Sequence, residues 1–209
     1  MMETNLGNPL EPLSIESTSG MVHEILSQTQ KKMGAVPAMY LGMANNPALL
    51  DSYLYSFQSF LEHSGFTLRE QEVIFLSISV ENGCEYCVAA HSFIADKISY
   101  VSHDIIYAIR NNTEISDPKL KSLSLFARAI TVKRGYPSGE DLDDFYDAGY
   151  SAKDILGVIA AVGVQTFSNY FNHFFHTQLD TKYTPWAWKN KSESNIAESE
   201  SRVILANSN

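Results

Sequence analysis

The amino-acid sequence predicts an all-α fold, and three observations support this prediction. Apolar residues recur at intervals of three and four through most of the 209-residue chain, which is the spacing of one helix face. No run of alternating apolar and polar residues is convincing as a strand. Helix-capping residues stand where the apolar runs begin and end. We therefore expect one helical domain over residues 18–180, with an N-terminal extended arm, residues 1–17, and a C-terminal tail, residues 181–209.

Glycine and proline divide the first part of this domain. Gly34 ends a first predicted helix over residues 18–33, and Gly65 ends a longer helix that begins at Pro47. A short helical segment near residues 38–44 lies between them. The residues expected on the inward faces of the two longer helices are Met21, Val22, Ile25, Leu26, Leu50, Leu54, Phe57 and Leu61.

A capping box opens the next helix. Thr67 is followed three residues later by Glu70, and the helix that they begin is expected to run to about residue 80. Residues 81–83, Glu-Asn-Gly, break it. A further helix is then expected from Cys84 to about residue 96.

Capping residues also mark the helices of the last part. The expected starts are, in chain order, Ser102, Asp117, Ser138 and Ser151. The first of these helices ends near residue 111, and Gly135 closes the second. The last helix is the longest, over residues 152–178.

Composition and charge restrict the classes of partner. Hydrophobic residues make up 44% of the chain, enough for a folded core, and the formal net charge is -9. So acidic a protein is repelled by nucleic-acid phosphates and by anionic lipid. Residues 1–20 lack the pattern of a signal peptide, and the apolar stretch 155–164 is too short to span a bilayer. We expect a cytoplasmic protein that binds neither nucleic acid nor a membrane.

The chain has two cysteines, and they stand three residues apart as Cys84-Glu85-Tyr86-Cys87. A disulfide between them would close so short a loop that it would remove little entropy from the unfolded chain. A structural staple therefore does not explain the spacing. In a reducing compartment such a pair indicates redox or metal chemistry.

A histidine lies on the same helix face as the two cysteines. At about 100° per residue, Cys84, Cys87 and His91 fall within an arc of about 60°. Val88, Ala95 and Ile98 share this face, so the site is expected to look into packed structure. Ordinary packing of two buried cysteines and a histidine is the alternative interpretation.

Two effects could activate one of the thiols. The first turn of a helix stabilises a thiolate through its unpaired N–H groups, which favours Cys84. The imidazole of His91, one turn beyond Cys87, can accept or relay a proton, which favours Cys87. These two effects leave open which sulfur reacts first.

Glu72 is the fourth candidate residue. Leu68, Phe75 and Leu76 surround it on its helix, and a carboxylate in such an apolar stripe is costly without a partner. Carboxylates in such places tend to serve as proton acceptors or donors. The alternative is a glutamate at the edge of the stripe whose side chain reaches solvent.

The spacing of these four residues resembles a known motif. Eleven residues separate Glu72 from Cys84, two separate Cys84 from Cys87, and three separate Cys87 from His91. This spacing resembles that of the alkylhydroperoxidases of the AhpD type, in the carboxymuconolactone decarboxylase family. The surrounding Asn-Gly-Cys-Glu-Tyr-Cys-Val-Ala-Ala-His-Ser is similar to the peroxidase-related members of that family. The similarity in helix pattern covers roughly residues 20–180.

This resemblance implies an all-helical enzyme without a cofactor or metal that reduces alkyl hydroperoxides, or exchanges disulfides, in antioxidant defence. It implies that Cys87 attacks the peroxide, that Cys84 resolves the product as a disulfide, and that His91 and Glu72 relay the proton. It also implies a thiol or dithiol reductant and a homotrimer or homohexamer. One position departs from the AhpD pattern: Tyr86 stands where that protein has a second histidine.

Three other functions remain open. A zinc-binding module is one, although ligands on one regular helix are unusual for structural zinc. A non-catalytic redox sensor is another. A lactone decarboxylase, like the founding members of the family, is the third, and those enzymes act without a cysteine pair. A separate metal site on the last helix would have to use His173, His176, Asn169 and Asp180, for which packing is the simpler explanation.

Overall fold

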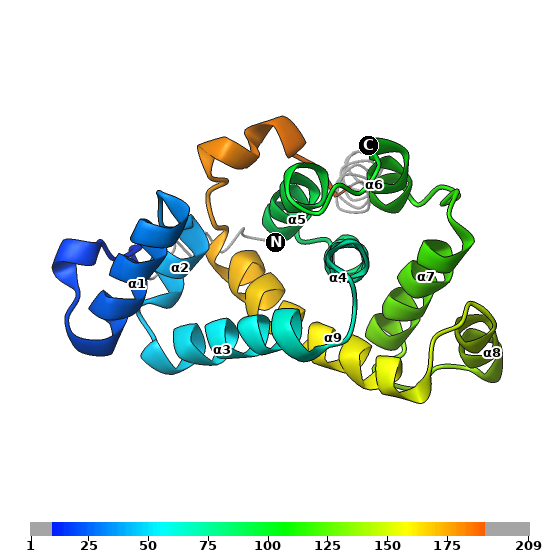
Figure 1. Ribbon diagram of the computed structural model, residues 1–209. Helices are drawn as coiled ribbons and strands as arrows, with labels where there is room; N and C mark the ends of the chain where they lie inside the picture. Colours follow the sequence, from blue (N-terminus) through cyan, green and yellow to red (C-terminus); the bar gives the residue numbers. More distant parts are fainter. Residues whose placement is uncertain (1–9, 191–209) are drawn as a thin grey trace, which may run out of the picture.

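The computed structural model of the protein describes residues 10–190 and shows helices without a strand in that part, which confirms the all-α prediction (Figure 1). The elements are, in chain order, the 3-10 turn η1 (Ile15–Ser17), α1 (Gly20–Met33), α2 (Ala38–Met43), α3 (Pro47–His63), α4 (Leu68–Glu81), α5 (Glu85–Lys97), α6 (His103–Asn111), α7 (Pro118–Val132), α8 (Gly139–Asp147), α9 (Ala152–Phe175) and the 3-10 helix η2 (Thr181–Trp186).

Helix α4 forms the centre of the molecule and packs against α5, α6, α7 and α9 (Figure 1). Every residue from Glu70 to Val80 is buried, because apolar side chains cover most of the helix circumference. Small serines fill the tighter contacts, and the hydroxyl of Ser77 lies 2.7 Å from that of Ser124 on α7. This placement holds Glu72 inside the core.

The longest helix, α9, packs against α3, α4 and α7 and so contacts elements at both ends of the molecule. Helix α2 packs on α3 and α9 at one end, and α8 packs on α7 at the other (Figure 1). The rings of Phe126 and Phe145 stack there with centroids 4.0 Å apart. Gly157 permits a close approach on α9, since a Cβ at this position would lie 2.8 Å from the ring of Phe66.

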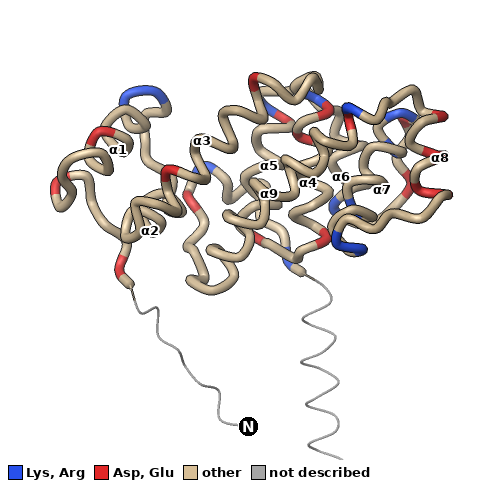
Figure 2. Tube along the Cα trace, turned by 90° about the horizontal axis from the view of Figure 1, so that it is seen from below, with Lys and Arg blue, Asp and Glu red and all other residues tan. Residues whose placement is uncertain are grey.

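Charged residues lie mainly at the helix ends and near α8, whereas α9 has none over residues 155–175 (Figure 2). None of the helices within residues 10–190 combines the length and the apolar character that crossing a lipid bilayer would require.

Most predicted helix boundaries are confirmed. The capping box at Thr67 is present as expected, and Ser138 and Ser151, which were expected as caps, also form capping boxes. The last helix was predicted too long: α9 ends at Phe175 because His176 adopts a left-handed conformation, with φ of 47°. The inward placement of Met21 was also wrong, since 47% of this residue is exposed.

The arm and tail are only partly described. Residues 15–17 of the arm form a 3-10 turn rather than extended chain. Residues 181–190, assigned to the tail, lie against the domain: η2 packs on α5, Tyr183 is buried, and the Trp188 indole donates to the Arg110 carbonyl at 3.0 Å. Residues 1–9 and 191–209, which hold the rest of the predicted arm and tail, lie outside the described residues.

Candidate active site

A tight turn between α4 and α5 positions the two cysteines. Gly83 has a φ of +73°, in the left-handed region that favours glycine, and Cys84 follows as the N-cap of α5. The Cys84 sulfur accepts a hydrogen bond from the backbone N–H of Cys87 at 3.4 Å. The first cysteine therefore caps the helix that carries the second.

The structure brings the four predicted site residues into one buried region. Their exposed fractions are 0% for Cys84, 3% for Cys87, 6% for His91 and 3% for Glu72. The alternative in which Glu72 reaches solvent is therefore wrong. Two apolar neighbours were misplaced by the sequence analysis: Leu68 is 59% exposed, and Ile98, at the end of α5, is 54% exposed.

The imidazole of His91 is held between Glu72 and Gln165. Its Nδ1 lies 2.9 Å from Oε2 of Glu72, and its Nε2 lies 2.8 Å from Nε2 of Gln165. An amide nitrogen can only donate, so Gln165 donates to His91 Nε2, and the ring hydrogen resides on Nδ1 and is donated to Glu72. The Phe75 ring stacks on the imidazole with centroids 4.9 Å apart.

The charge of Glu72 governs the protonation of His91. Burial alone would lower the pKa of this imidazole, but the charge and hydrogen bond of Glu72, and then the charge of Cys87, raise it above its ordinary value. Among the hydrogen bonds within residues 10–190, none joins His91 to Cys87, because both ring nitrogens are already engaged. The imidazole acts on the thiol through its charge rather than through the direct contact that helix spacing suggested.

The two thiols differ in acidity. Burial raises the pKa of Cys87, but its polar neighbours outweigh that effect and lower it to about 7. The groups that lower it are, largest first, the Cys84 side chain, the charge of His91, the side-chain amide of Asn172 and the hydroxyl of Ser168. Burial, the hydrogen bond to Cys87 and the charge of Cys87 instead raise the pKa of Cys84 well above its usual range. Cys87 is therefore the sulfur that ionises first.

Polar residues of α9 complete the site, and the sequence analysis missed most of them. Asn172 donates its amide to the sulfur of Cys87 at 3.2 Å. Asn82 donates to Asn169 at 2.8 Å, and Asn169 donates to Oε1 of Gln165 at 2.7 Å. This chain of amides fixes the orientation of Gln165 against His91. A signal was present, since Gln165, Ser168, Asn169 and Asn172 are spaced i, i+3, i+4 and i+7 on an otherwise apolar helix.

Tyr86, the residue that departs from the AhpD pattern, lies beside this chemistry, but its hydroxyl bonds to neither His91 nor Cys87. Its hydroxyl donates to Asp180, which also accepts the backbone N–H of Ala38 at 3.1 Å. Burial, the hydrogen bond to Asp180 and the Asp180 charge raise the pKa of Tyr86 far above its ordinary value. Tyr86 stays protonated and links α5 to η2 and α2.

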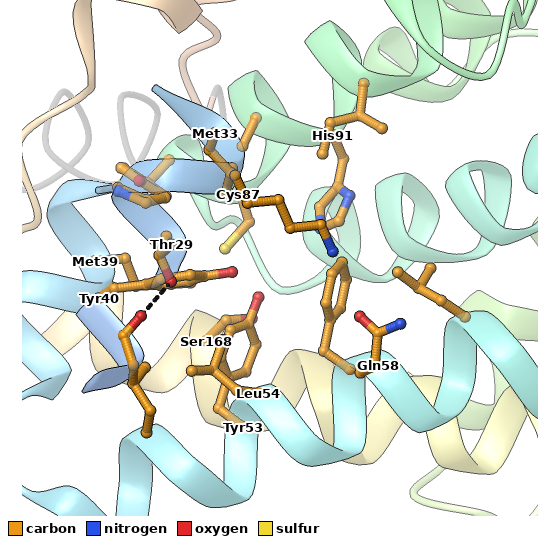
Figure 3. Close-up of a pocket in the computed structure, with 18 of the residues that line it drawn as sticks. Thr29, Met33, Met39, Tyr40, Tyr53, Leu54, Gln58, Cys87, His91 and Ser168 are labelled. Carbon is orange, nitrogen blue, oxygen red and sulfur yellow. Dashed lines mark hydrogen bonds between the residues drawn. The ribbon is translucent and has the colours of Figure 1, made fainter. Parts of the chain in front are cut away.

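A cavity of about 400 Å³ opens beside Cys87, between α1, α3 and α5 (Figure 3). The sulfur of Cys87 and the hydroxyls of Tyr40 and Tyr53 point into it (Figure 3). Apolar side chains line much of the remainder, namely Ile25, Met33, Met39, Leu54, Phe57, Leu61 and Ile94. A cavity of this size is typical of a binding site for a small organic molecule.

The geometry provides little for a metal ion. Within residues 10–190, no group of three or more His, Cys, Asp or Glu side chains is arranged to bind one. The proposed set on the last helix is not assembled, since Asn169 belongs to the amide chain and Asp180 accepts from Tyr86.

Comparison with known proteins agrees with the motif. Residues 47–129 match the model of the carboxymuconolactone decarboxylase family, and this span contains Glu72, Cys84, Cys87 and His91. The resemblance inferred from the motif is thereby confirmed. No curated protein sequence matches the chain significantly.

Solved structures show the same fold. A peroxidase-related protein with an alkylhydroperoxidase AhpD core from Ralstonia eutropha JMP134 is 20% identical, with a TM-score of 0.75 over 83% of this chain and 93% of that chain. A peroxidase-related protein from Silicibacter sp. TM1040 is 20% identical, with a TM-score of 0.70 over 88% and 95%. The debrominase Bmp8, in complex with 2,3,4-tribromopyrrole, is 18% identical, with a TM-score of 0.72 over 87% and 96%. The chain therefore has the AhpD-like fold.

Proposed function

We propose that this protein is a thiol-dependent peroxidase in which Cys87 reduces an organic hydroperoxide and Cys84 resolves the product. One observation carries the proposal: a cysteine whose pKa is lowered to about 7 lines a cavity, while a second cysteine of higher pKa stands one helical turn away. Simple packing of two thiols does not need this difference in acidity. Perturbed pKa values beside a cavity are typical of functional sites.

In the first step, the Cys87 thiolate attacks the terminal oxygen of the hydroperoxide. A sulfur–oxygen bond forms and the O–O bond breaks, so Cys87 is oxidised to a sulfenic acid and the peroxide is reduced. The leaving alkoxide takes up one proton and departs as an alcohol. The pair of Glu72 and His91 supports this step, because Glu72 raises the pKa of His91 and the ring, once Nε2 takes up a proton, stabilises the thiolate by its positive charge.

In the second step, Cys84 attacks the sulfenic sulfur of Cys87. The S–S bond forms, the S–O bond breaks, and the hydroxide that leaves takes the Cys84 proton to become water. The position of Cys84 at the N-cap suits this step, because the first residues of a helix move more readily than its interior. An external dithiol then returns two electrons and two protons to the disulfide. This cycle requires a reducing compartment, and we propose the cytoplasm.

Peroxide consumption with dithiothreitol as the reductant tests the proposal. The wild-type protein should consume an organic hydroperoxide, and Cys87→Ser should lose this activity. Ser99→Ala is the control variant. It changes another buried residue in the same region of the chain, so it shows whether a substitution there impairs folding. Equal rates for wild type and Cys87→Ser would remove peroxidase chemistry at this thiol.

Reductive debromination is a second candidate, favoured by the aromatic side chains of the cavity and by the likeness to the debrominase Bmp8. In that reaction an aryl bromide and two thiols would give an arene, bromide, a proton and a disulfide. Bromide release from 2,3,4-tribromopyrrole, compared between wild type and Cys87→Ser, tests it. Release without peroxide consumption would favour debromination over the leading proposal.

We also propose that the protein forms a homo-oligomer, a trimer or hexamer, through α9. Large apolar side chains stay exposed along one face of this helix, at Leu156, Ile159, Phe167, Tyr170 and Phe174. A continuous exposed stripe of this kind is typical of an interface. Sedimentation of wild type and Ile159→Glu tests this proposal, with Tyr107→Glu on exposed α6 as the control. A monomeric wild type would contradict it.

A further inference from the structure

The cavity beside Cys87 has two ends of different chemistry. At its inner end, Tyr40 and Tyr53 are 8% and 5% exposed, and their rings meet edge to face with centroids 5.8 Å apart. Burial raises the pKa of Tyr40 to about 12, and burial, followed by the charges of Tyr40 and Cys87, raises that of Tyr53 still further. Both hydroxyls therefore remain protonated. The hydrogen bond between them lowers the pKa of Tyr40 and raises that of Tyr53, so Tyr53 donates to Tyr40. The Tyr40 hydroxyl keeps its own proton and can donate it to an oxygen atom of a substrate that lies against Cys87.

The outer end of the cavity lies at the end of α1 and is marked by Lys32. This exposed residue is the only Lys, Arg, Asp or Glu among the residues that line the cavity. It stands in the last turn of α1 next to Lys31, where Figure 2 shows a basic segment beside the α1 label. Within the described part of the chain, no carboxylate forms a salt bridge with Lys32.

A lysine at the cavity is notable in a chain whose net charge is negative. A protein of formal charge -9 repels anions in general, so an anionic ligand needs a local cation. Lys32 provides one at the mouth, and Met33, Leu54 and Phe57 provide apolar surface between the mouth and the thiol. A purely apolar substrate would leave this cation without a function in binding.

We propose that the substrate is an amphipathic hydroperoxide with an apolar body and a carboxylate, which pairs with Lys32 while the hydroperoxide group lies at Cys87. This inference rests on the proposed function and names the substrate class of the same site. The Tyr40 hydroxyl, which Tyr53 holds by its own hydrogen bond, donates to the peroxide end, and the apolar lining holds the body. Hydrogen peroxide, which has neither an apolar body nor a carboxylate, uses only a small part of this cavity.

The test compares two ligands that differ only in charge. A medium-chain fatty acid with a terminal hydroxyl, which is the product of the proposed reaction, and its methyl ester are titrated calorimetrically into the wild-type protein. The acid should bind about fivefold more tightly, the upper range for an exposed ion pair, and added salt should reduce the difference. The corresponding hydroperoxides should show the same preference in kcat/KM.

Two neighbouring variants separate a specific contact from a general effect of charge. Lys32→Gln should reduce the preference for the acid to within about twofold. Lys31→Gln removes the same charge one residue away, outside the cavity lining, and should retain the preference. Equal affinity of the wild type for acid and ester would overturn the inference, and so would equal effects of the two substitutions. A preference for the acid without any hydroperoxide consumption would overturn the proposed function and leave the carboxylate site standing.

Discussion

Glu72 and His91 are joined by a 2.9 Å hydrogen bond across the turn between α4 and α5. The turn at Gly83 reverses the chain, so that the carboxylate on the central helix meets the imidazole on the cysteine helix. Both groups are buried, so this hydrogen bond supplies the polar partner that the Glu72 carboxylate and His91 Nδ1 need. Glu72 raises the pKa of His91, and the charge of His91 lowers the pKa of Cys87. Changes in this pair should therefore change the pKa of Cys87.

The first prediction concerns the reactivity of the thiols with pH. Only the thiolate is alkylated, so the rate rises as pH rises through the pKa of each cysteine. Cys87, with its pKa lowered to about 7, should become reactive between about pH 6 and 8, whereas Cys84, with a raised pKa, should react only in more alkaline solution. Peptide mapping after iodoacetamide treatment at a series of pH values measures both. Reaction of Cys84 at the lower pH would contradict the assignment.

The second prediction concerns Glu72→Gln. This substitution keeps the side-chain volume but removes the negative charge that raises the pKa of His91. The imidazole then carries less positive charge near pH 7, and the pKa of Cys87 rises because a stabilising cation is lost. The alkylation profile of Cys87 should move to higher pH by about one pH unit, with helix content unchanged by circular dichroism.

A matched control for this substitution lies on the same helix. Glu81→Gln removes a carboxylate at the exposed end of α4, where Glu81 pairs with Arg128, and should leave the alkylation profile of Cys87 in place. Identical profiles for wild type and Glu72→Gln would reduce Glu72 to a structural residue.

The third prediction concerns Gln165, whose amide donates to Nε2 of His91. Protonation of Nε2 removes the acceptor for that hydrogen bond, so the neutral amide opposes a second proton on the ring. A carboxylate at this position would accept from a protonated Nε2, and its other oxygen would accept from Asn169 as the amide oxygen does now. Gln165→Glu should therefore raise the pKa of His91 by more than one pH unit.

Nuclear magnetic resonance of the His91 ring measures this pKa directly. Gln165→Leu, which removes the opposing amide without adding an acceptor, is the matched comparison and should raise the pKa of His91 less than Gln165→Glu does. If both variants titrate like the wild type, the amide of Gln165 has no influence on the imidazole.

The helices were predictable from the sequence because their signals are local. A capping box such as Thr67 and Glu70 requires residues only three positions apart, and glycines such as Gly83 stop a helix where they stand. The end of α9 was less predictable, since the left-handed conformation of His176 has no strong local signal. The burial of Glu72 was predicted correctly from its apolar neighbours, although one of them, Leu68, is exposed.

The contacts of the site were predictable only within one helix. The shared face of Cys84, Cys87 and His91 follows from helix geometry, but the direction of the imidazole depends on α4 and α9. Gln165 and Asn172 lie far from the cysteines in sequence, and only tertiary packing brings their amides to His91 and Cys87. Helix spacing alone therefore suggested that His91 bonds directly to Cys87, whereas the hydrogen bonds of His91 go to Glu72 and Gln165.

The last prediction concerns the order in which the two sulfurs react, for which the sequence left two possibilities. The N-cap position favours Cys84 as the thiolate, because the helix dipole is strongest there. The structure weighs against this choice: burial and the neighbouring Cys87 raise the pKa of Cys84 well above its usual range, whereas the pKa of Cys87 is lowered to about 7. With Cys84→Ser, one equivalent of hydroperoxide should leave a sulfenic acid on Cys87 that dimedone traps, because no second thiol remains to capture it. With Cys87→Ser, Cys84 should oxidise at least tenfold more slowly near pH 7, since its thiol is then largely protonated. The wild-type protein serves as the reference, and it should yield an intramolecular disulfide and little dimedone adduct. The reverse pattern, with a trapped sulfenic acid on Cys84 and a slow Cys87, would exchange the two roles.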